Sequence, residues 1–229
     1  MKAIYVYKTG GFENLTLVDV AEPAAQDHEA LVSIKAIGVN FIDIYYRSGL
    51  YPAALPIKLG LEAAGIVEKT GKDVKDFKVG DRVAYANVFG SYAQKNVVPA
   101  DRLVKLPSQL SFKEGAAAIL QGITAHYLTQ STYPLKKSDT CLIHAAAGGV
   151  GLLLCQVAKL IGATVIGTVS TNEKAQLAKK AGADHVIFYT KQDVVMEVKK
   201  LTSGKGVNVV YDSVGKTTFD QSLECLVPR

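Results

Sequence analysis

Apolar and polar residues alternate over short stretches in the first half of the chain. Residues 31–37 alternate as a half-buried strand requires, and a second valine-rich stretch surrounds residues 65–68. Turn-forming residues recur between such stretches, at Gly10-Gly11, Gly71-Lys-Asp, Gly80-Asp-Arg, Pro99-Ala-Asp and Pro107-Ser. This pattern predicts a compact β-rich domain.

The pattern changes after Ser111-Phe-Lys-Glu, which has the spacing of a helix capping box. Helical segments then alternate with short apolar strands. We expect strands at 140–144, 164–169, 185–189 and 207–212, with helices at 149–161, 172–181 and 192–202. This order is typical of βαβ units on a parallel sheet. The chain therefore divides into a β-rich domain at 1–120 and a doubly wound α/β domain at 121–229.

The second domain shows fewer strands than its fold class normally has. Four strands can be identified, whereas a doubly wound dinucleotide-binding sheet has about six. The chain stops at Cys225-Leu-Val-Pro-Arg229, within the helix or turn that should lead to a fifth strand. We therefore expect the sequence to be truncated at its C-terminus, and the parallel sheet to be incomplete.

The strongest chemical signal is the segment His144-Ala-Ala-Ala-Gly-Gly-Val-Gly151, between a predicted strand and a predicted helix. It fits the glycine fingerprint of dinucleotide-binding folds, with Ala146, Gly148 and Gly151 in the three slots. Gly148 would let the backbone approach a pyrophosphate, and Gly151 would let the helix lie close to the strand. The free N–H groups at the start of the helix would bind the anion. The alternative is a tight turn without a ligand.

The end of the next strand indicates which dinucleotide is bound. NAD-preferring sites usually place a carboxylate there, but this chain has Ser170, followed by Thr171-Asn-Glu-Lys174. Hydroxyl groups and an ammonium group could bind a 2′-phosphate, so we expect NADPH rather than NADH. Glu173 complicates this interpretation, and Lys174 could instead be an ordinary surface lysine.

Zinc chemistry and hydrolytic chemistry lack the residues they need. Residues 1–120 contain no cysteine, and their only histidine is His28, in a polar turn, so we expect no metal site there. The three cysteines, at 141, 155 and 225, lie among aliphatic neighbours and are expected to be buried thiols. Neither a Gly-x-Ser-x-Gly elbow nor a paired-carboxylate arrangement is apparent.

Composition supports a globular protein that binds small molecules. The 229 residues are 48% hydrophobic and carry a net charge of +5, with the excess of positive charge in the second half. The lysines are scattered, so we do not expect a nucleic-acid partner. No apolar run approaches the ~20 residues that span a membrane, and the start of the chain resembles a strand rather than a signal peptide. We therefore expect a cytoplasmic protein without a membrane partner.

Several motifs together resemble one family within the medium-chain dehydrogenase/reductase superfamily. This family is the zinc-free, zeta-crystallin-like NADPH:quinone oxidoreductases, and the resemblance is strongest to its bacterial members. The resemblance runs the whole length of the chain. The matching segments are Gly38-Val-Asn-Phe-Ile-Asp-Ile-Tyr-Tyr-Arg-Ser-Gly-Leu-Tyr51, Leu59-Gly-Leu-Glu-Ala-Ala-Gly-Ile-Val, Val79-Gly-Asp-Arg-Val, Gln121-Gly-Ile-Thr-Ala, Ala145-Ala-Ala-Gly-Gly-Val-Gly and Tyr211-Asp-Ser-Val-Gly.

The resemblance implies a fold and a set of site residues. It implies a GroES-like β domain, a Rossmann domain and a homodimer. Zinc-dependent relatives have cysteine where this chain has Asn40, and histidine where it has Leu61, before the retained Glu62. By analogy the active-site wall consists of Asn40, Asp43, Tyr45 and Tyr51. The implied NADPH contacts are Tyr127, Ala146, Gly148, Gly149, Val150, Gly151, Ser170, Lys174, Tyr189, Ser213 and Val214.

These residues suggest NADPH-dependent reduction of a quinone by hydride or electron transfer, with Asn40 or Tyr51 donating a hydrogen bond to the substrate oxygen. Each of these side chains could also be purely structural. Reduction of an enone or another activated double bond is the nearest alternative. A non-catalytic protein that binds nucleotide or RNA is the alternative from another class. Family members continue for roughly another hundred residues, so the activity of this chain alone is in doubt.

Overall fold

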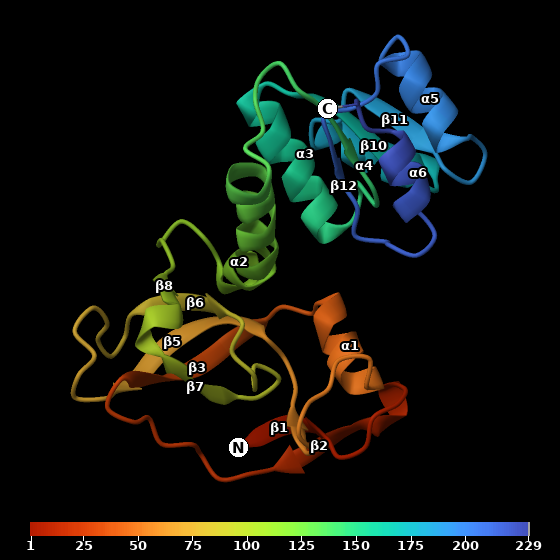
Figure 1. Cartoon of the computed structure of the whole chain (residues 1–229). Coiled ribbons are helices and arrows are strands. Elements are labelled where there is room, and N and C mark those ends of the chain that lie inside the picture. The colour runs from red at the N-terminus through yellow and green to blue at the C-terminus, as the bar shows by residue number, and fades with distance from the viewer. Residues whose placement is uncertain (229) are drawn as a thin grey trace. The chain divides into compact units, whose positions relative to one another are not determined.

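The structure is a computed structural model that describes residues 1–228. It divides into two compact units, Met1–Leu120 and Gln121–Arg229, and each is described on its own. Figure 1 shows the β-rich first unit and the α/β second unit. No helix in the described part of the chain is both long and apolar enough to cross a membrane.

Two antiparallel sheets form the first unit. The larger sheet has the order β7-β3-β5-β6-β8, and the smaller has the order β2-β1-β4. Their strands are β1 (Lys2–Val6), β2 (Leu15–Asp19), β3 (Glu29–Ile37), β4 (Ile57–Lys58), β5 (Glu62–Thr70), β6 (Arg82–Ala86), β7 (Lys95–Pro99) and β8 (Leu103–Lys105). Val32, Val67 and Tyr85 are fully buried in the core of the larger sheet. The predicted strands at 31–37 and around 65–68 are thus confirmed as β3 and β5.

The helical elements of the first unit are few and short. They are α1 (Phe41–Ser48) and the 3-10 turns η1 (Phe12–Asn14) and η2 (Ala100–Arg102). The helix α2 (Phe112–Tyr127) begins in this unit and continues into the second. Its start is the predicted capping box, because the Ser111 N–H donates to Glu114 Oε2 at 2.7 Å and the Glu114 N–H donates to Ser111 Oγ at 3.2 Å.

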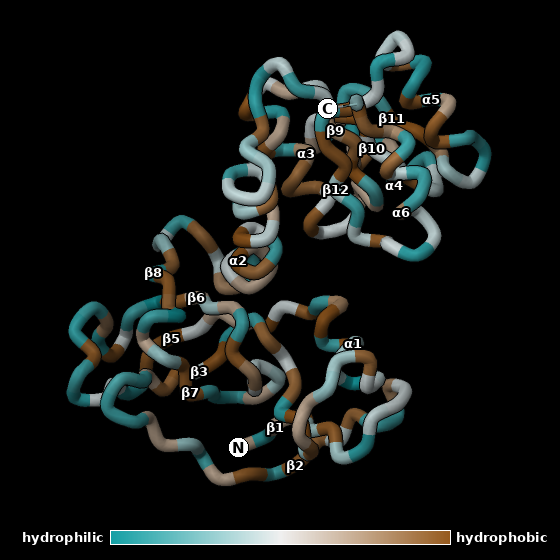
Figure 2. Tube along the Cα trace, in the orientation of Figure 1, coloured by the Kyte–Doolittle hydropathy of each residue, from teal (hydrophilic) through white to brown (hydrophobic). Residues whose placement is uncertain are grey.

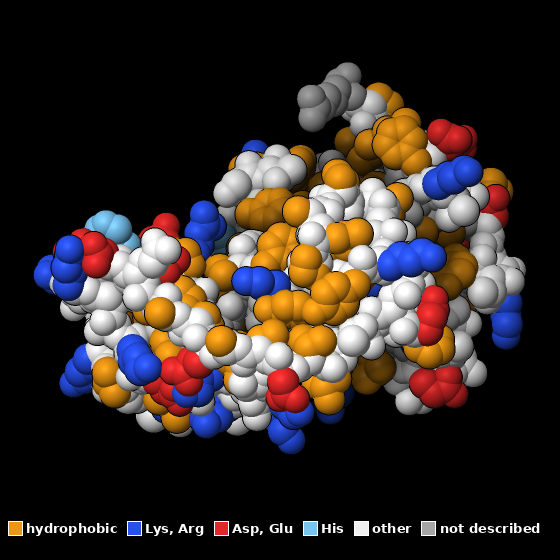
Figure 3. Space-filling view, turned by 90° about the horizontal axis from the view of Figure 1, so that it is seen from below, with side chains coloured by type: hydrophobic (Ala, Val, Ile, Leu, Met, Phe, Trp, Pro, Cys, Tyr) orange, Lys and Arg blue, Asp and Glu red, His pale blue; other side chains and the backbone are white. Residues whose placement is uncertain are grey.

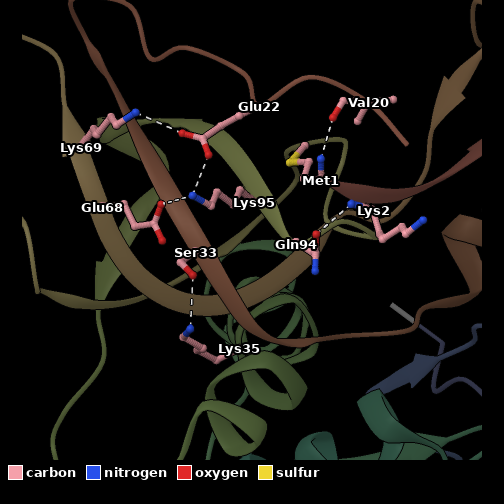
Figure 4. A network of polar contacts seen from close by, with 10 residues as sticks. All are labelled: Met1, Lys2, Val20, Glu22, Ser33, Lys35, Glu68, Lys69, Gln94 and Lys95. Atoms are coloured by element: carbon pink, nitrogen blue, oxygen red, sulfur yellow. Dashed lines mark hydrogen bonds and ion pairs between the residues drawn. The ribbon is translucent and has the colours of Figure 1, made fainter. Parts of the chain in front are cut away.

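Charged side chains link β5, β7 and the segment after β2 in the first unit (Figure 4). Lys95 Nζ lies 2.7 Å from Glu22 Oε2 and 2.6 Å from Glu68 Oε2, and Lys69 Nζ lies 3.1 Å from Glu22 Oε1. The hydrogen bond from Lys95, with that from Lys69, lowers the pKa of Glu22. These groups are open to solvent, so their contribution to stability is small and depends on salt.

The second unit contains one parallel sheet in the order β11-β10-β9-β12. Its strands are β9 (Thr140–Ile143), β10 (Thr164–Val169), β11 (His185–Phe188) and β12 (Val209–Tyr211). Its other helices are α3 (Gly149–Ile161), α4 (Asn172–Lys180), α5 (Val194–Leu201), α6 (Phe219–Glu224) and the π-helical segment η3 (Leu128–Thr132). The predicted alternation of strands and helices, including the limits of α3 and β10, is confirmed.

Alternate residues of the parallel strands face opposite layers of helices. Cys141 and Ile143 of β9 pack with α3 and α4, whereas Leu142 between them packs with α5. Both faces are therefore buried, as parallel sheets require, and the strands form the apolar centre of the unit in Figure 2. The three cysteines are free and buried, as expected from their apolar neighbours.

Apolar side chains are also common on the surface. Phe12, Phe41 and Val39 are at least 70% exposed. Figure 3 shows hydrophobic side chains gathered near the middle of one face, with many of the charged side chains toward its margin. Because much of any protein surface is apolar, exposure by itself does not mark a binding site.

Candidate cofactor and substrate sites

The glycine-rich turn lies between the end of β9 and the start of α3. Gly148 is the N-cap of α3, and its N–H donates to the Ala145 carbonyl at 2.8 Å. The Ala146 N–H donates to the Thr168 carbonyl of β10 at 3.1 Å. Ala145 has a φ of +49°, in the left-handed region that residues other than glycine rarely adopt. The turn is therefore tightly fixed by backbone contacts.

The turn has the shape that a pyrophosphate requires. A Cβ on Gly151 would lie 2.8 Å from Ala146 Cα, so only glycine allows α3 to pack this close to the turn. A Cβ on Gly148 would have only the Ala145 carbonyl oxygen nearby, at 3.2 Å, and Gly148 is exposed. Exposed backbone at the start of a 13-residue helix suits an anion. These residues fit the pyrophosphate of a dinucleotide.

Three predicted contacts for the adenosine phosphate lie at one edge of the sheet. Val169 pairs with Phe188, so Ser170 and Tyr189, which follow them, are neighbours at the carboxyl ends of β10 and β11. Lys174 Nζ donates to Ser170 Oγ at 3.2 Å, and both Lys174 and Tyr189 are exposed. The structure thus brings together a hydroxyl, an ammonium and a phenol, groups that could bind a 2′-phosphate.

The loop after β12 is held by a carboxylate. Asp212 Oδ1 accepts hydrogen bonds from the N–H groups of Val214 and Gly215 at 2.9 and 3.0 Å and from the Thr218 hydroxyl at 2.9 Å. Partial burial opposes ionisation of Asp212, but these donors, together with Ser222, lower its pKa to about 2. Ser213 and Val214 are exposed at the tip of this loop, where the sequence predicted cofactor contacts.

The remaining predicted cofactor residues differ in exposure. Tyr127, the last residue of α2, is 46% exposed, and Val150 is half-buried in the first turn of α3. Gly149 is exposed, while Ala146 is fully buried and packs in the core. Ala146 therefore shapes the turn from within rather than presenting a side chain to a ligand.

A buried polar cluster in the first unit surrounds Asn40. Asn40 and Asp43 form a capping box at the start of α1, in which the Asn40 N–H donates to Asp43 Oδ2 at 2.9 Å. Asn40 Nδ2 donates to Glu62 Oε2 at 2.8 Å, and the other Glu62 oxygen accepts the Leu120 N–H at 2.7 Å. The Tyr92 hydroxyl donates to Asp43 Oδ2 at 2.9 Å. Asn40 is therefore held by two carboxylates.

Burial raises the pKa of both carboxyls in this cluster. Asp43 is 2% exposed and Glu62 is fully buried, and loss of solvent is the main cause of each raised pKa. Hydrogen bonds from Asn40 oppose the shift in both, and the charge of Asp43 adds to the shift in Glu62. Burial, followed by the charge of Asp43, also raises the pKa of Tyr92. The two raised carboxyl pKa values close to one amide make this cluster a candidate functional site.

Aromatic rings lie along α1 and the segment after it. The rings of Tyr45 and Tyr51 have centroids 5.3 Å apart, and Tyr46 lies 5.7 Å from Tyr51 and 4.9 Å from Phe89. Tyr51 is 44% exposed. Gly49, with a φ of +85°, caps the end of the helix, and the Tyr51 N–H donates to the Tyr45 carbonyl at 3.1 Å. This turn places the two predicted tyrosines side by side.

In residues 1–228, no group of three or more histidine, cysteine, aspartate or glutamate side chains is arranged to hold a metal ion. The sequence did not indicate the roles of Tyr92, Thr168 and Ser222, which take part in buried hydrogen bonds. Ser222 and Thr168 are far apart along the chain from their partners, so local spacing gave no signal. A signal in the sequence could have come from polar residues that directly follow apolar strands, such as His144 and Asp212.

Comparison with known proteins places the chain among oxidoreductases. The model of the alcohol dehydrogenase GroES-like domain matches residues 26–108, and that of the zinc-binding dehydrogenase matches residues 149–229. Quinone oxidoreductase 1 of Escherichia coli (strain K12) is 50% identical over 228 residues, which cover 99% of this chain and 70% of that protein. A 2-haloacrylate reductase of Burkholderia sp. is 44% identical over 234 residues, again covering 99% of this chain and 70% of that protein.

The fold of the chain is also that of a solved relative. The crystal structure of Escherichia coli quinone oxidoreductase complexed with NADPH superposes with a TM-score of 0.98 at 50% identity. It is matched over 100% of this chain and 71% of its own length. The glycine-rich turn and the Asn40 cluster described above therefore belong to a fold that binds NADPH in that protein.

Proposed function

This chain belongs to the quinone oxidoreductase family of the medium-chain dehydrogenase/reductase superfamily, and from that premise we propose that it binds NADPH and takes part in quinone reduction. The observation that carries the proposal is the contact between Lys174 and Ser170 beside the glycine-rich turn. It supplies a cation and a hydroxyl at the strand end where an NAD-specific site has a carboxylate.

NADPH, when bound, supplies a hydride from its nicotinamide ring, and a quinone that accepts this hydride and one proton becomes a hydroquinone. The chain's own residues orient the reactants. The exposed Tyr51 donates a hydrogen bond to the quinone oxygen that gains charge, and Asn40, fixed by Glu62, supports the same oxygen. Asp43 fixes the start of α1 and so the position of Asn40.

We propose that the reaction proceeds without a bound metal. Asn40 and Leu61 stand where zinc-dependent relatives have cysteine and histidine, and an amide and an alkyl group are poor zinc ligands. The conjugated carbonyls of a quinone already accept a hydride, so the substrate needs no Lewis acid. Asn40 and Tyr51 supply hydrogen bonds in place of the metal.

The experiment is a titration of the chain with NADPH and NADH, followed by turnover with a series of quinones. Lys174→Ala should weaken NADPH binding on the order of tenfold, because one charged contact to phosphate is lost, and should leave NADH binding unchanged. Lys179→Ala, on the same helix but in its last turn, is the matched control and should change neither. Equal binding of both nucleotides by the unmodified chain would refute the proposed preference.

Reduction of an activated carbon–carbon double bond is the second candidate, and the 44% identity to a 2-haloacrylate reductase supports it. Quinones and enones are both flat, conjugated acceptors, so the same donors could serve either. A ratio of kcat/KM that favours enones over quinones would select this candidate. The cytoplasmic location, the homodimer and the absence of nucleic-acid partners stay predictions.

A further inference from the structure

Four polar side chains, three of them buried and one partly buried, form a chain of hydrogen bonds beside the glycine-rich turn. His144 follows β9 and Asp212 follows β12, while Thr168 lies in β10 and Ser222 in α6. His144 Nδ1 lies 3.1 Å from Thr168 Oγ1, and His144 Nε2 lies 3.2 Å from Ser222 Oγ. Ser222 Oγ donates to Asp212 Oδ2 at 2.7 Å. We call these four residues the His144 network.

The strand register explains why these residues meet. Ile143 pairs with Gly167 on one side and with Tyr211 on the other. The residues that follow, His144, Thr168 and Asp212, therefore lie in one row across three strands. Ile143 and Tyr211 pack with the α3 side, so the residues after them face the opposite layer, which contains α6. Ser222 of α6 completes the chain from that layer.

The hydrogen bonds fix where each proton lies. Asp212 is ionised, because four donors surround its two oxygens. Ser222 therefore donates to Asp212 and must accept from His144, which places a proton on His144 Nε2. In a neutral imidazole, His144 Nδ1 then has only a lone pair and accepts from the Thr168 hydroxyl. Each hydrogen bond in the network is donated in the direction from Thr168 to Asp212. In this arrangement of protons every donor has an acceptor.

The network touches both loops that were assigned to the cofactor. His144 directly precedes Ala145, whose left-handed φ of +49° is strained in an alanine. The His144 N–H also donates to the Tyr211 carbonyl at 3.0 Å, one residue before Asp212. Asp212 in turn holds the N–H groups of Val214 and Gly215. Strain of this kind persists only where neighbouring contacts impose it, and the network supplies such contacts.

We propose that the His144 network positions the glycine-rich turn and the loop after β12 relative to each other, so that its residues determine NADPH affinity without touching the nucleotide. This inference rests on the proposed function, because it assigns NADPH to this turn. Thr168, His144 and Ser222 are 1%, 4% and 6% exposed, so they act as positioning residues.

The charge state of His144 agrees with this role. Burial lowers the pKa of His144, and the negative charge of Asp212 opposes that shift. Asp212 is the charged group that acts on the imidazole, and the other partners, Thr168 and Ser222, are neutral hydroxyls. The lowered pKa favours the neutral imidazole for which the hydrogen-bond directions were assigned.

The first test replaces Thr168 in two ways and measures the Kd for NADPH by nicotinamide fluorescence. Thr168→Val keeps the shape but loses the hydroxyl, so it should raise the Kd on the order of fivefold, which corresponds to one hydrogen bond of ~1 kcal/mol. Thr168→Ser keeps the hydroxyl and should restore most of the affinity. Thr129→Val is the matched control, because Thr129 is equally buried in the same unit but bonds to the Ala125 carbonyl, outside the network.

The second test reads the tautomer of His144 by long-range ¹H–¹⁵N correlation, with His144→Gln identifying its signals among the four histidines. The expected spectrum shows a protonated Nε2 and an unprotonated Nδ1. The opposite tautomer would overturn the proposed direction of the network. The measurement of the tautomer needs no bound nucleotide, so it does not depend on the proposed function.

The outcomes separate the two proposals. If the unmodified chain binds no NADPH, both the proposed function and the role of the network in binding fail. If the unmodified chain binds NADPH and Thr168→Val binds it equally well, only the positioning role fails. A Kd that rises equally in Thr168→Val and Thr129→Val would assign the effect to general loss of stability and would also overturn the positioning role.

Discussion

Two glycines in the glycine-rich turn meet different surroundings, which leads to different expectations for replacing them. Gly151→Ala should lower the free energy of unfolding by about 1–3 kcal/mol, because its Cβ would lie 2.8 Å from Ala146 Cα. Gly148→Ala should cost less stability, because its φ of −79° suits alanine and the Ala145 carbonyl oxygen, at 3.2 Å, is the one atom near the new Cβ. Its new methyl group should instead weaken NADPH binding by at least about tenfold.

Urea unfolding and NADPH titration of both variants measure these effects. Gly122→Ala is the control, because a Cβ there would meet no atom within 4 Å. The assignment of Gly148 to the pyrophosphate would be wrong if Gly148→Ala bound NADPH as tightly as the unmodified chain. The assignment of Gly151 to packing would be wrong if its variant unfolded at the same urea concentration.

Asp43 should make stability depend on pH. Its folded pKa is raised above the ordinary value of 3.8 by burial, so ionisation destabilises the fold. That cost is absent below the ordinary pKa, appears as the pH rises through the raised pKa, and is fully present above it. Asp43→Asn keeps an oxygen for the two donors and carries no charge. It should therefore be more stable than the unmodified chain at pH 8, by an amount on the order of 1 kcal/mol, and lose this advantage near pH 4.

Thermal unfolding of Asp43→Asn and of the unmodified chain across this pH range measures the difference in their stability. Asp43→Ala provides a contrast, because it leaves the Asn40 N–H and the Tyr92 hydroxyl without their acceptor at every pH. It should be less stable than Asp43→Asn throughout. An advantage of Asp43→Asn that grew as the pH fell would contradict the raised pKa.

Site residues could be predicted from sequence where chemistry is local, and not where distant segments meet. The glycine turn and the pair Ser170 and Lys174 each lie within one short stretch, so local spacing alone brings their residues together. Asn40 was identified from a family resemblance, but its bond to Glu62, 22 residues away, follows from the pairing of strands. The link from Ser222 to His144 spans 78 residues and depends on the packing of α6.

The start of α5 shows how a cap sets an element's limit. The sequence predicted a helix from residue 192, but the helix begins at Val194 because Asp193 is its N-cap and accepts the Met196 N–H at 2.9 Å. Gln192 instead uses its side chain to accept the Phe188 N–H at 2.8 Å. Asp193→Ala should therefore lower stability by about 1 kcal/mol, while Asp193→Ser, which keeps a cap, should lower it by a few tenths at most.

Chemical denaturation of these two variants tests the cap. Equal losses in both would mean that the Asp193 side chain does not cap the helix. The difference should persist in the absence of NADPH, since α5 lies outside the residues assigned to the cofactor. The same cap signal, a polar residue before an apolar helical stretch, predicts the start of a helix at Ser111. At Asp193 the signal was not used, so the predicted helix began too early.

Elements were predictable in proportion to their length and the regularity of their pattern. The limits of α3 follow from a long apolar repeat closed by glycine, because Gly162 ends α3 with a φ of +92°. The helix α1 was not identified as a helix, since its eight residues span barely two turns and its start depends on the capping box of Asn40 and Asp43. The π-helical segment η3 gave no local pattern either.

At the scale of the whole molecule, two compact units should respond unequally to one ligand. The turn, Ser170, Lys174 and the loop after β12 all belong to the second unit, so NADPH binding should stabilise that unit most. At a hundredfold excess over its Kd, a ligand stabilises the state it binds by about 2.7 kcal/mol. Hydrogen exchange of the slowest amides in β9 and β10 should slow on the order of a hundredfold.

Amides of β3 and β5 in the first unit should slow much less, because their core is made of residues from their own sheet. Hydrogen–deuterium exchange followed by mass spectrometry, with and without NADPH, compares the two sets. Thr168→Val at the same NADPH concentration should show less protection in β9 and β10, since weaker binding transmits less stabilisation. Equal protection of both units would mean that they unfold as one cooperative body, and the affinity of the second unit for NADPH would then control the stability of the whole chain.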